Sequence, residues 1–448
     1  MARILTSKFA VIGCLTLLFL VVLAMLSNLV SERQSYNESV LKEIGKDYVN
    51  PQVLMTPFIV VPTTVSQACT NDIQKICLFD KNVIISPRHS SWEHQLRVSD
   101  ENFKRGIYKA ITYADVVAIK GNFVVPNQLM TPPSNQVVHW EKATIRLSVS
   151  DLRGLTNQPV LTLNRQKVVF NFPTEDSTNP LGVTFTEAPI TLNPQIQNLD
   201  FNLDFDLNGM SSLEVIPLGN DMSMALEANW AHPSFYGASL PQKTFQANSF
   251  SAIWQNTYIA NQNAERLNAC LGNGNSSACD LLKTAENSAF AVKFVYAVDT
   301  YTMSDRTIKY ALLFLTITFG TFFLFEVLKR LRIHPMQYTL VAAALGVFYL
   351  LLLSFSEHVG FAMAYLGSSI ACVLLISFYV YYVLKGIGRT FILTIILSAM
   401  YGALYVILQS EDLTLILGSV LVFVLIAVMM FLTRNVDWYD ISASTSNP

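Results

Sequence analysis

The stretch LLLLSFSEHVGFAMAYL, Leu350–Leu366, places two apolar segments next to each other with only a few polar residues between them. Glu357 and His358 stand at the junction, just before Gly360. A carboxylate beside an imidazole can belong to a proton relay, to half of a metal site, or to the turn of a membrane hairpin. Because apolar segments lie on both sides of Glu357 and His358, the first question is where this junction lies relative to a membrane.

The whole chain is apolar, and its apolar residues are clustered. Of 448 residues, 52% are hydrophobic and only 14% are charged, whereas about a quarter of the residues in a soluble domain are charged. A helix needs about 20 consecutive apolar residues to cross a bilayer. The sequence predicts an uncleaved N-terminal signal anchor and five C-terminal spans: Phe9–Val30, Tyr310–Leu328, Met336–Phe355, Phe361–Leu384, Phe391–Leu408 and Leu413–Leu432.

The short loops between the C-terminal segments differ in charge. Cytoplasmic loops carry an excess of Lys and Arg, and the loops SEHVG and QSED contain neither. Basic residues concentrate at the other ends of the segments, at Arg3, Lys8, Lys329, Arg330, Arg332, Lys385, Arg389 and Arg434, while Arg306 and Lys309 mark the outer interface before Tyr310. Both termini are therefore predicted to be cytoplasmic, and Glu357 and His358 to lie at the outer surface.

This topology divides the chain into four parts. They are a cytoplasmic N-terminus with the signal anchor (1–30), an outer domain (31–307), a five-helix transmembrane bundle (308–433) and a cytoplasmic tail (434–448). Helical spacing of apolar residues in Ser31–Tyr48 predicts a stalk helix. Short segments rich in Val, Ile, Thr and Phe follow it and predict an antiparallel β-rich domain. The predicted fold class is an α+β membrane protein with six transmembrane helices.

One strand of the outer domain is especially clear in the sequence. LDFNLDFDLN, from Leu199 to Asn208, alternates apolar and polar residues, so one face meets the core and the other meets water. Its acidic positions resemble the start of a calcium loop, but Val215 stands where the closing Glu is required. A solvated strand face is the favoured interpretation.

The cysteines agree with an outer domain in an oxidising compartment. That region contains two close pairs, Cys69 with Cys77 and Cys270 with Cys279. Disulfides persist outside the reducing cytoplasm, so we predict local 69–77 and 270–279 bridges. The spacing leaves two other connectivities open, and unpaired thiols are the remaining alternative.

No catalytic signature emerges from the motifs. The chain lacks a G-x-S-x-G elbow, a P-loop and an H-E-x-x-H zinc motif, so we expect no enzymatic activity and no cofactor. His89 and His94 in HSSWEH have no Cys, Asp or Glu cluster that completes a metal-binding spacing. The formal net charge is −2, and no basic patch of the outer domain indicates a nucleic-acid partner.

Two groups of residues are candidate contact sites. NWAHPSFYGASLPQ, Asn229–Gln242, concentrates aromatic side chains, which form either a partner surface or a rigid turn packed on the β-core. The candidates for a partner surface are Trp230, His232, Phe235 and Tyr236.

The second group surrounds the opening stretch. The central parts of the predicted spans lack ionisable residues, which argues against proton coupling because such residues mark ion pathways. Glu357 and His358 are therefore candidates for docking the outer domain on the bundle, with Arg306 as a partner. A plain wet turn is the alternative.

The chain resembles the CreD family of bacterial inner-membrane proteins along nearly its whole length. The matching segments are RGIY (Arg105–Tyr108), NWAHPSF (Asn229–Phe235), DRTIKY (Asp305–Tyr310), RIHPMQY (Arg332–Tyr338), FYLLLLSFSEHVGF (Phe348–Phe361) and TRNVDWY (Thr433–Tyr439). The resemblance implies a Gram-negative inner membrane, a periplasmic outer domain, and a link to envelope integrity and to an envelope-stress or carbon-source-responsive two-component regulon. It supplies no catalytic residues.

The sequence therefore favours a non-enzymatic membrane protein that supports cell-envelope integrity. Its expected partners are the lipid bilayer and an unidentified periplasmic or inner-membrane protein or envelope component, and its oligomeric state is left open. A transporter or lipid-handling protein is the alternative, for which Gly346, Gly367, Gly386 and Gly388 are the only hints of broken helices. An envelope enzyme with an unrecognised site is the third hypothesis.

Overall fold

The computed structural model separates into two compact units. One consists of Met1–Glu38 with Val298–Pro448, and the other is Ser39–Ala297. The residues that the structure describes are 2–69, 72–171, 185–257, 262–272, 276–283, 289–296, 299–329, 334–384, 386–409 and 414–434.

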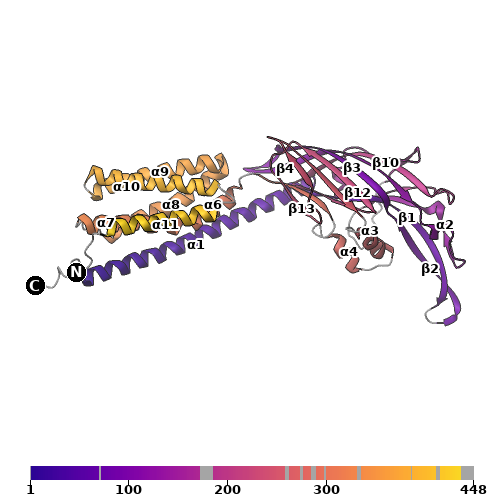
Figure 1. The fold of residues 1–448 in the computed structure, drawn as a ribbon, viewed down its shortest axis with the longest axis horizontal. Helices are drawn as coiled ribbons and strands as arrows, with labels where there is room; N and C mark the ends of the chain where they lie inside the picture. The colour runs from indigo at the N-terminus through magenta and orange to yellow at the C-terminus, as the bar shows by residue number, and fades with distance from the viewer. Residues whose placement is uncertain are drawn as a thin grey trace, which may run out of the picture. The chain divides into compact units, whose positions relative to one another are not determined.

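The first unit is helical, and its C-terminal helices lie beside the first part of α1 (Figure 1). The long helices are α1 (Ala2–Asp47), α7 (Ala311–Lys329), α8 (Pro335–Val359), α9 (Phe361–Leu384), α10 (Ile387–Gln409) and α11 (Thr414–Thr433), with a short α6 (Thr300–Lys309) before α7. Four of them, namely α1, α8, α9 and α10, are long and apolar enough to cross a membrane. The other two predicted spans coincide with α7 and α11.

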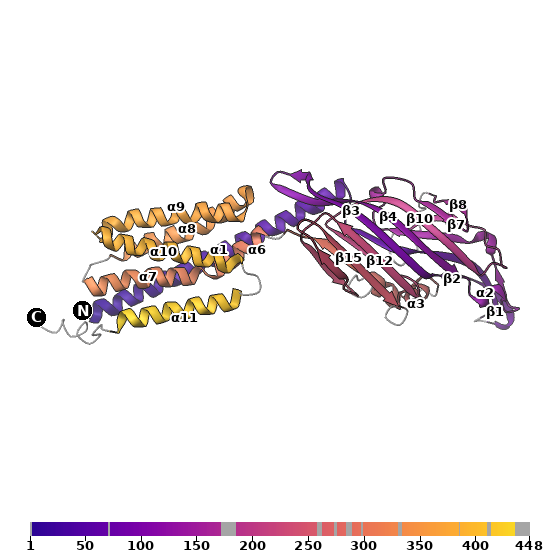
Figure 2. The same cartoon turned by 45° about the horizontal axis from the view of Figure 1, so that its top comes forward.

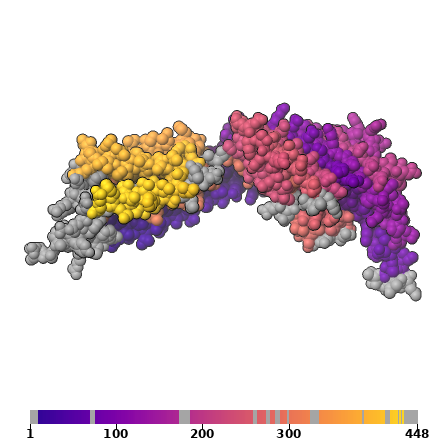
Figure 3. All heavy atoms as spheres, in the orientation of Figure 1, coloured from indigo at the N-terminus to yellow at the C-terminus, as the bar shows by residue number. Residues whose placement is uncertain are grey.

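The α8 helix has one face packed in the bundle and another left open. Phe348 and Leu352 are each 1% exposed, whereas Val347 and Leu350 are each 45% exposed. An open apolar face is costly in water but not against lipid tails. The atoms of α11, which contacts α10, form part of the visible surface of this unit (Figure 3).

Both ends of α8 are defined by local hydrogen bonding and backbone geometry. At the start, His334 Nδ1 accepts a hydrogen bond from the Met336 N–H, and Gln337 Oε1 accepts one from the His334 N–H. Pro335 occupies the first helical position, where its missing N–H costs nothing. At the other end, Gly360 has φ +81°, a conformation that side chains disfavour. Ser356–Val359 therefore form the last turn of α8, and Gly360 alone connects α8 to α9.

The second unit contains two eight-stranded sheets. Sheet A runs in the order β13 (Pro233–Gly237), β16 (Phe290–Phe294), β11 (Ser212–Ile216), β1 (Gln52–Cys69), β6 (Thr144–Val149) and β9 (Phe185–Pro189), with β2 (Asp72–Ile85) and β5 (Gln136–Val138) also paired to β1. Sheet B runs in the order β14 (Gln242–Phe245), β15 (Phe250–Thr257), β12 (Asp221–Ala228), β3 (Pro87–Arg105), β4 (Tyr108–Val124), β10 (Asn198–Met210), β7 (Val160–Leu163) and β8 (Gln166–Val169) (Figure 2). Short helical segments are α2 (Asn127–Met130), η1 (Trp140–Lys142), η2 (Leu152–Gly154), α3 (Asn263–Leu267), η3 (Asn268–Gly272) and α4 (Ser276–Lys283).

The two sheets share one hydrophobic core, which makes this unit a β-sandwich. Residues of sheet A such as Ile145 and Val292 belong to the same buried cluster as Trp92 and Leu203 of sheet B. In β10 the predicted alternation is confirmed, because Leu199, Phe201, Leu203, Phe205 and Leu207 are all buried. This segment is a regular strand and not a calcium loop.

The prediction of an antiparallel β-rich domain fails at two strand pairs. Strand β1 pairs with β11 in parallel, and β3 pairs with β12 in parallel. The remaining strand pairs are antiparallel, as in the long β3–β4 and β10–β4 ladders. Alternation reports which side of a strand is buried but not the direction of its neighbour. The alternation therefore could not predict which strands pair when the two strands lie more than 100 residues apart in sequence.

The end of α1 is built into the sandwich, and the predicted stalk is its continuation. At about 1.5 Å per residue, the 46 residues of α1 extend about 69 Å, against about 30 Å for a hydrocarbon core. Val40 and Ile44 pack with Ala110 and Met210 in a small buried cluster.

Arg153 completes this junction with hydrogen bonds. Its guanidinium donates to the carbonyl oxygens of Gly45 and Lys46, which are among the last in α1 and have no partner inside the helix. Asp151 accepts from Arg153 Nε at 2.9 Å and from both the backbone and side-chain N–H groups of Asn50 at 3.0 Å. The Arg153 guanidinium and these N–H groups lower the pKa of Asp151 to about 2.

We predict that Arg153→Gln destabilises the β-sandwich. The lowered pKa of Asp151 corresponds to about 2 kcal/mol of folding free energy at neutral pH. Because the folded-state pKa lies below the ordinary value of 3.8, this stabilisation is complete above about pH 4 and is lost as the pH falls through about 2. Thermal melting of the full chain in detergent, followed from pH 7 to pH 2, measures both effects.

The matched control is Arg105→Gln. Arg105 pairs with Glu43 and Asp47 at the surface of the same junction, and exposed ion pairs contribute about 1 kcal/mol or less. Equal losses for Arg105→Gln and Arg153→Gln at pH 7 would contradict the role given to the Arg153–Asp151 pair.

Candidate functional site

Glu357 meets the segment that leads into the helical bundle. Its Oε1 accepts a hydrogen bond of 3.1 Å from the Tyr301 hydroxyl, and Tyr301 is only 6% exposed. Tyr301 lies in α6, whose first turn is capped by Asp299 through its carboxylate. Glu357 therefore ties the end of α8 to α6 within the helical unit.

The other two members of the predicted docking group do not join this contact. Among the described residues, no ion pair links Arg306 to Glu357. His358 is exposed, and its Nδ1 lies 3.0 Å from the carbonyl oxygen of Ser354 in the same helix. The sequence predicted Arg306 as the partner of Glu357, whereas the hydrogen-bond partner in the structure is Tyr301, which precedes the SDRTIK segment. Tyr301 lies five residues before Arg306, and its phenol gives no charge signal.

The aromatic stretch at 230–236 packs on the sandwich. Trp230 Nε1 donates to the Val295 carbonyl oxygen at 2.9 Å. The Phe235 ring lies edge-on to Phe250 and Trp254, with centroid distances of 5.5 and 5.7 Å. These contacts favour the structural interpretation of this stretch.

The polar members of the same stretch differ in exposure. The Tyr236 hydroxyl donates to Glu214 Oε1 at 2.6 Å, and burial, reinforced by this bond, raises the pKa of Tyr236. His232 is the one exposed residue among the four candidates of this stretch, and the other three are partly buried. A partner surface here would therefore centre on His232.

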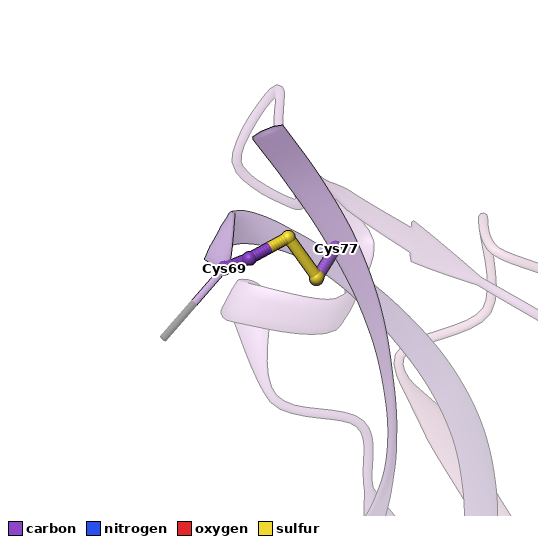
Figure 4. The surroundings of a disulfide bond; sticks show 2 residues. All are labelled: Cys69 and Cys77. Carbon is purple, nitrogen blue, oxygen red and sulfur yellow. A yellow bond between two sulfur atoms is a disulfide. The ribbon is translucent and has the colours of Figure 1, made fainter. Parts of the chain in front are cut away.

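The structure contains both predicted disulfides. Cys69 and Cys77 join β1 to β2 near the end of their hairpin (Figure 4). Cys270 and Cys279 join η3 to α4, and both are buried in a second cluster that covers the outer side of β1. Each bond closes a loop of fewer than a dozen residues, so each holds a local feature and not the sandwich as a whole.

A buried pair inside the sandwich was not anticipated from the sequence. His94 Nδ1 lies 2.6 Å from Asp115 Oδ2, and both side chains are fully buried. The Trp92 ring stacks on the His94 imidazole with centroids 5.6 Å apart. His94 is thus a core residue, whereas His89 points to the opposite face of β3 and pairs with Asp221 at 3.0 Å. The two histidines cannot share a metal.

The outer face of sheet B has a shallow polar depression of about 480 Å³. Strands β3, β4, β12 and β15 line it, and Ser91, Lys120, Ser223 and Gln255 are among its residues. Within the described part of the chain, no group of three or more His, Cys, Asp or Glu residues is arranged to hold a metal ion. The arrangement presents hydroxyl, amide and ammonium groups, which are suited to binding.

Four apolar helices of spanning length and a disulfide-containing β-sandwich define a membrane protein with a large β-rich domain. Residues 4–439 match the family model described as Inner membrane protein CreD. The inner membrane protein CreD of Escherichia coli K12 is 33% identical over 437 residues, covering 95% of this chain and 92% of that protein. The chain belongs to the CreD family and is a membrane protein of the cell envelope.

Similarity to solved structures adds nothing to this assignment. An M1 zinc metallopeptidase from Deinococcus radiodurans matches 38% of each chain with 9% identity and a TM-score of 0.19. A likeness this low carries no conclusion about the fold or the chemistry of the sandwich.

We predict that Glu357→Ala and Tyr301→Phe lower thermal stability in a coupled way. A hydrogen bond to a charged group contributes about 1.5–3 kcal/mol, so each single variant should melt earlier than wild type. The double variant should melt no earlier than Glu357→Ala alone, because the two residues share one interaction. Melting of the full chain in detergent measures this cycle.

His358→Ala is the control in the same turn, since His358 contacts only its own helix. Additive losses for the two variants, or an equal loss for His358→Ala, would show that Glu357 belongs to a plain wet turn. Membrane insertion should be normal in all variants.

Proposed function

We propose that this chain is a non-enzymatic inner-membrane protein whose sandwich lies in the periplasm and supports envelope integrity by binding an envelope component or a partner protein. The observation that carries the periplasmic placement is the distribution of the cysteines. Both disulfides belong to the β-rich unit, while the free thiols, Cys14 and Cys372, belong to the helical unit. Disulfides persist in the periplasm and are rare in the cytoplasm.

The charge pattern supports the same placement. With α7 and α11 as spans in addition to the four clear ones, the helical unit crosses the membrane six times and both termini are cytoplasmic. The basic residues before α8 and α10 then lie inside, and the SEHVG turn lies outside.

Binding through the sandwich is supported by its size and by its surface. A domain of this size can bury its own core, and its two sheets share one hydrophobic cluster. The depression on sheet B offers a recess for a ligand. Catalytic turnover of an envelope polymer by the purified chain would oppose this proposal.

No specific observation favours the transporter alternative. Helices α8, α9 and α10 each run without interruption, whereas transport sites are commonly built from broken helices. Gly367 and Gly388 have open space where a side chain would lie and make no close helix contact.

The placement is tested by cysteine labelling in cells. In a chain with Cys14→Ser and Cys372→Ser, we expect Gln166→Cys to react with a membrane-impermeant maleimide once the outer membrane is permeabilised. Ser442→Cys should react only after cell lysis, because the C-terminus is cytoplasmic. Non-reducing mass spectrometry of the same material should find the 69–77 and 270–279 bridges.

Two results would overturn the placement. One is labelling of Gln166→Cys only after lysis, which would put the sandwich in the cytoplasm. The other is four free thiols at Cys69, Cys77, Cys270 and Cys279 in protein taken from its native compartment.

A further inference from the structure

The polar depression on sheet B is built by one row of residues that crosses four strands. The strand register places Ser223 opposite Gln255 on one side and opposite Ser91 on the other, and places Ser91 opposite Lys120. Adjacent strands lie about 4.8 Å apart, so the row is about 14 Å long. The residues between them in sequence, such as Trp92 and Met224, point into the core, so this row belongs to the outer face.

Most of the residues that line the depression have polar or charged side chains. Apart from Met222 and Gly121, every lining residue has a polar or charged side chain. Ser90 also borders the depression, but it alternates with Ser91 along β3 and is 6% exposed, so its side chain belongs to the core face with Trp92.

The depression has an acidic residue, Asp221, on one side and a basic residue, Lys120, on the other. Asp221 is paired with His89 at 3.0 Å. Lys120 is exposed and forms no ion pair within the described part of the chain. An ammonium group beside a row of hydroxyl and amide groups suits a ligand that carries one anionic group among many hydroxyls.

A peptide strand does not fit this surface as well. Strands β12, β3 and β4 are each paired on both sides, so no free sheet edge is available for strand addition. The depression also lacks the apolar anchors that dominate protein interfaces.

Resting on the proposed function of binding an envelope component, we propose that the Gln255–Ser223–Ser91–Lys120 row binds an acidic glycan. Lys120 pairs with the carboxylate of the glycan, and the serine hydroxyls with the Gln255 amide bond its sugar hydroxyls and acetamido groups.

The test is a calorimetric titration of the full chain in lipid nanodiscs. The probe is a tetrasaccharide of alternating N-acetylglucosamine and N-acetylmuramic acid, and chitotetraose is the uncharged comparison. We expect the acidic probe to bind at least about tenfold more tightly than chitotetraose, because one charge-assisted hydrogen bond is worth about that factor. Lys120→Glu should remove this preference, and Ser223→Leu should abolish binding of both probes by filling the row.

Lys167→Glu is the matched control for charge. Lys167 is exposed on β8 of the same sheet and continues the same cross-strand row through Asn202 and Thr162, but it does not line the depression. The affinity of the Lys167→Glu variant for the acidic probe should equal that of wild type. Melting curves of all variants establish that the sandwich remains folded, and Gln255→Ala gives a milder second variant.

Three results would overturn the inference. The first is no binding of the acidic probe. The second is binding of the acidic probe by Lys120→Glu and by Ser223→Leu as tight as by wild type. The third is competition by inorganic phosphate alone at the affinity of the glycan, which would reveal a small-anion site. None of these results moves the sandwich out of the periplasm or excludes a protein partner, so the proposed function stands or fails on its own experiments.

Discussion

The interaction on which the fold most depends is the one between Arg153, Asp151 and the end of α1. A helix that leaves a membrane ends with carbonyl groups that need donors, and Arg153 supplies them at Gly45 and Lys46. The Asp151 carboxylate also accepts hydrogen bonds from the backbone and side-chain N–H groups of Asn50, which lies just before β1. The Arg153–Asp151 ion pair thus joins the last turn of α1 to the residues that lead into β1.

The hydrogen bonds around Asp151 also extend to the second sheet. Gln52 Nε2 donates to the carbonyl oxygens of Asp151 and of Asn208 in β10, and Gln52 is fully buried. The helix end, β1 and β10 are therefore fixed by one hydrogen-bonded group. The last residues of α1, from Ser39 onward, therefore belong to the sandwich unit.

The motifs that relate the chain to its family are in large part structural devices. The HPMQ core of RIHPMQY caps the start of α8, and Gly360 of SEHVG permits the turn into α9. Trp230 of NWAHPSF is tied to the backbone of Val295. Residues of this kind keep a fold, so their presence does not by itself indicate chemistry.

The sequence predicted what depends on local periodicity and failed where distant strands meet. Apolar length located the helices, and the alternation in β10 was sufficient to find its buried face. The parallel pairings of β1 and β3, the His94–Asp115 pair and the polar row on sheet B all require the order of strands. Ser91 and Ser223 lie 132 residues apart and meet only through the β3–β12 pairing, so no local pattern could have joined them.

The most direct test of the account is photo-crosslinking from the sandwich in intact cells. A benzophenone amino acid at Ser223 reports what occupies the depression, and the same group at Lys167 reports the rest of the outer face. The account predicts an envelope component, either glycan or protein, attached at Ser223 and absent at Lys167. Adducts only with cytoplasmic proteins, or no adduct at any position on the sandwich, would contradict the claim that this domain acts by binding in the periplasm.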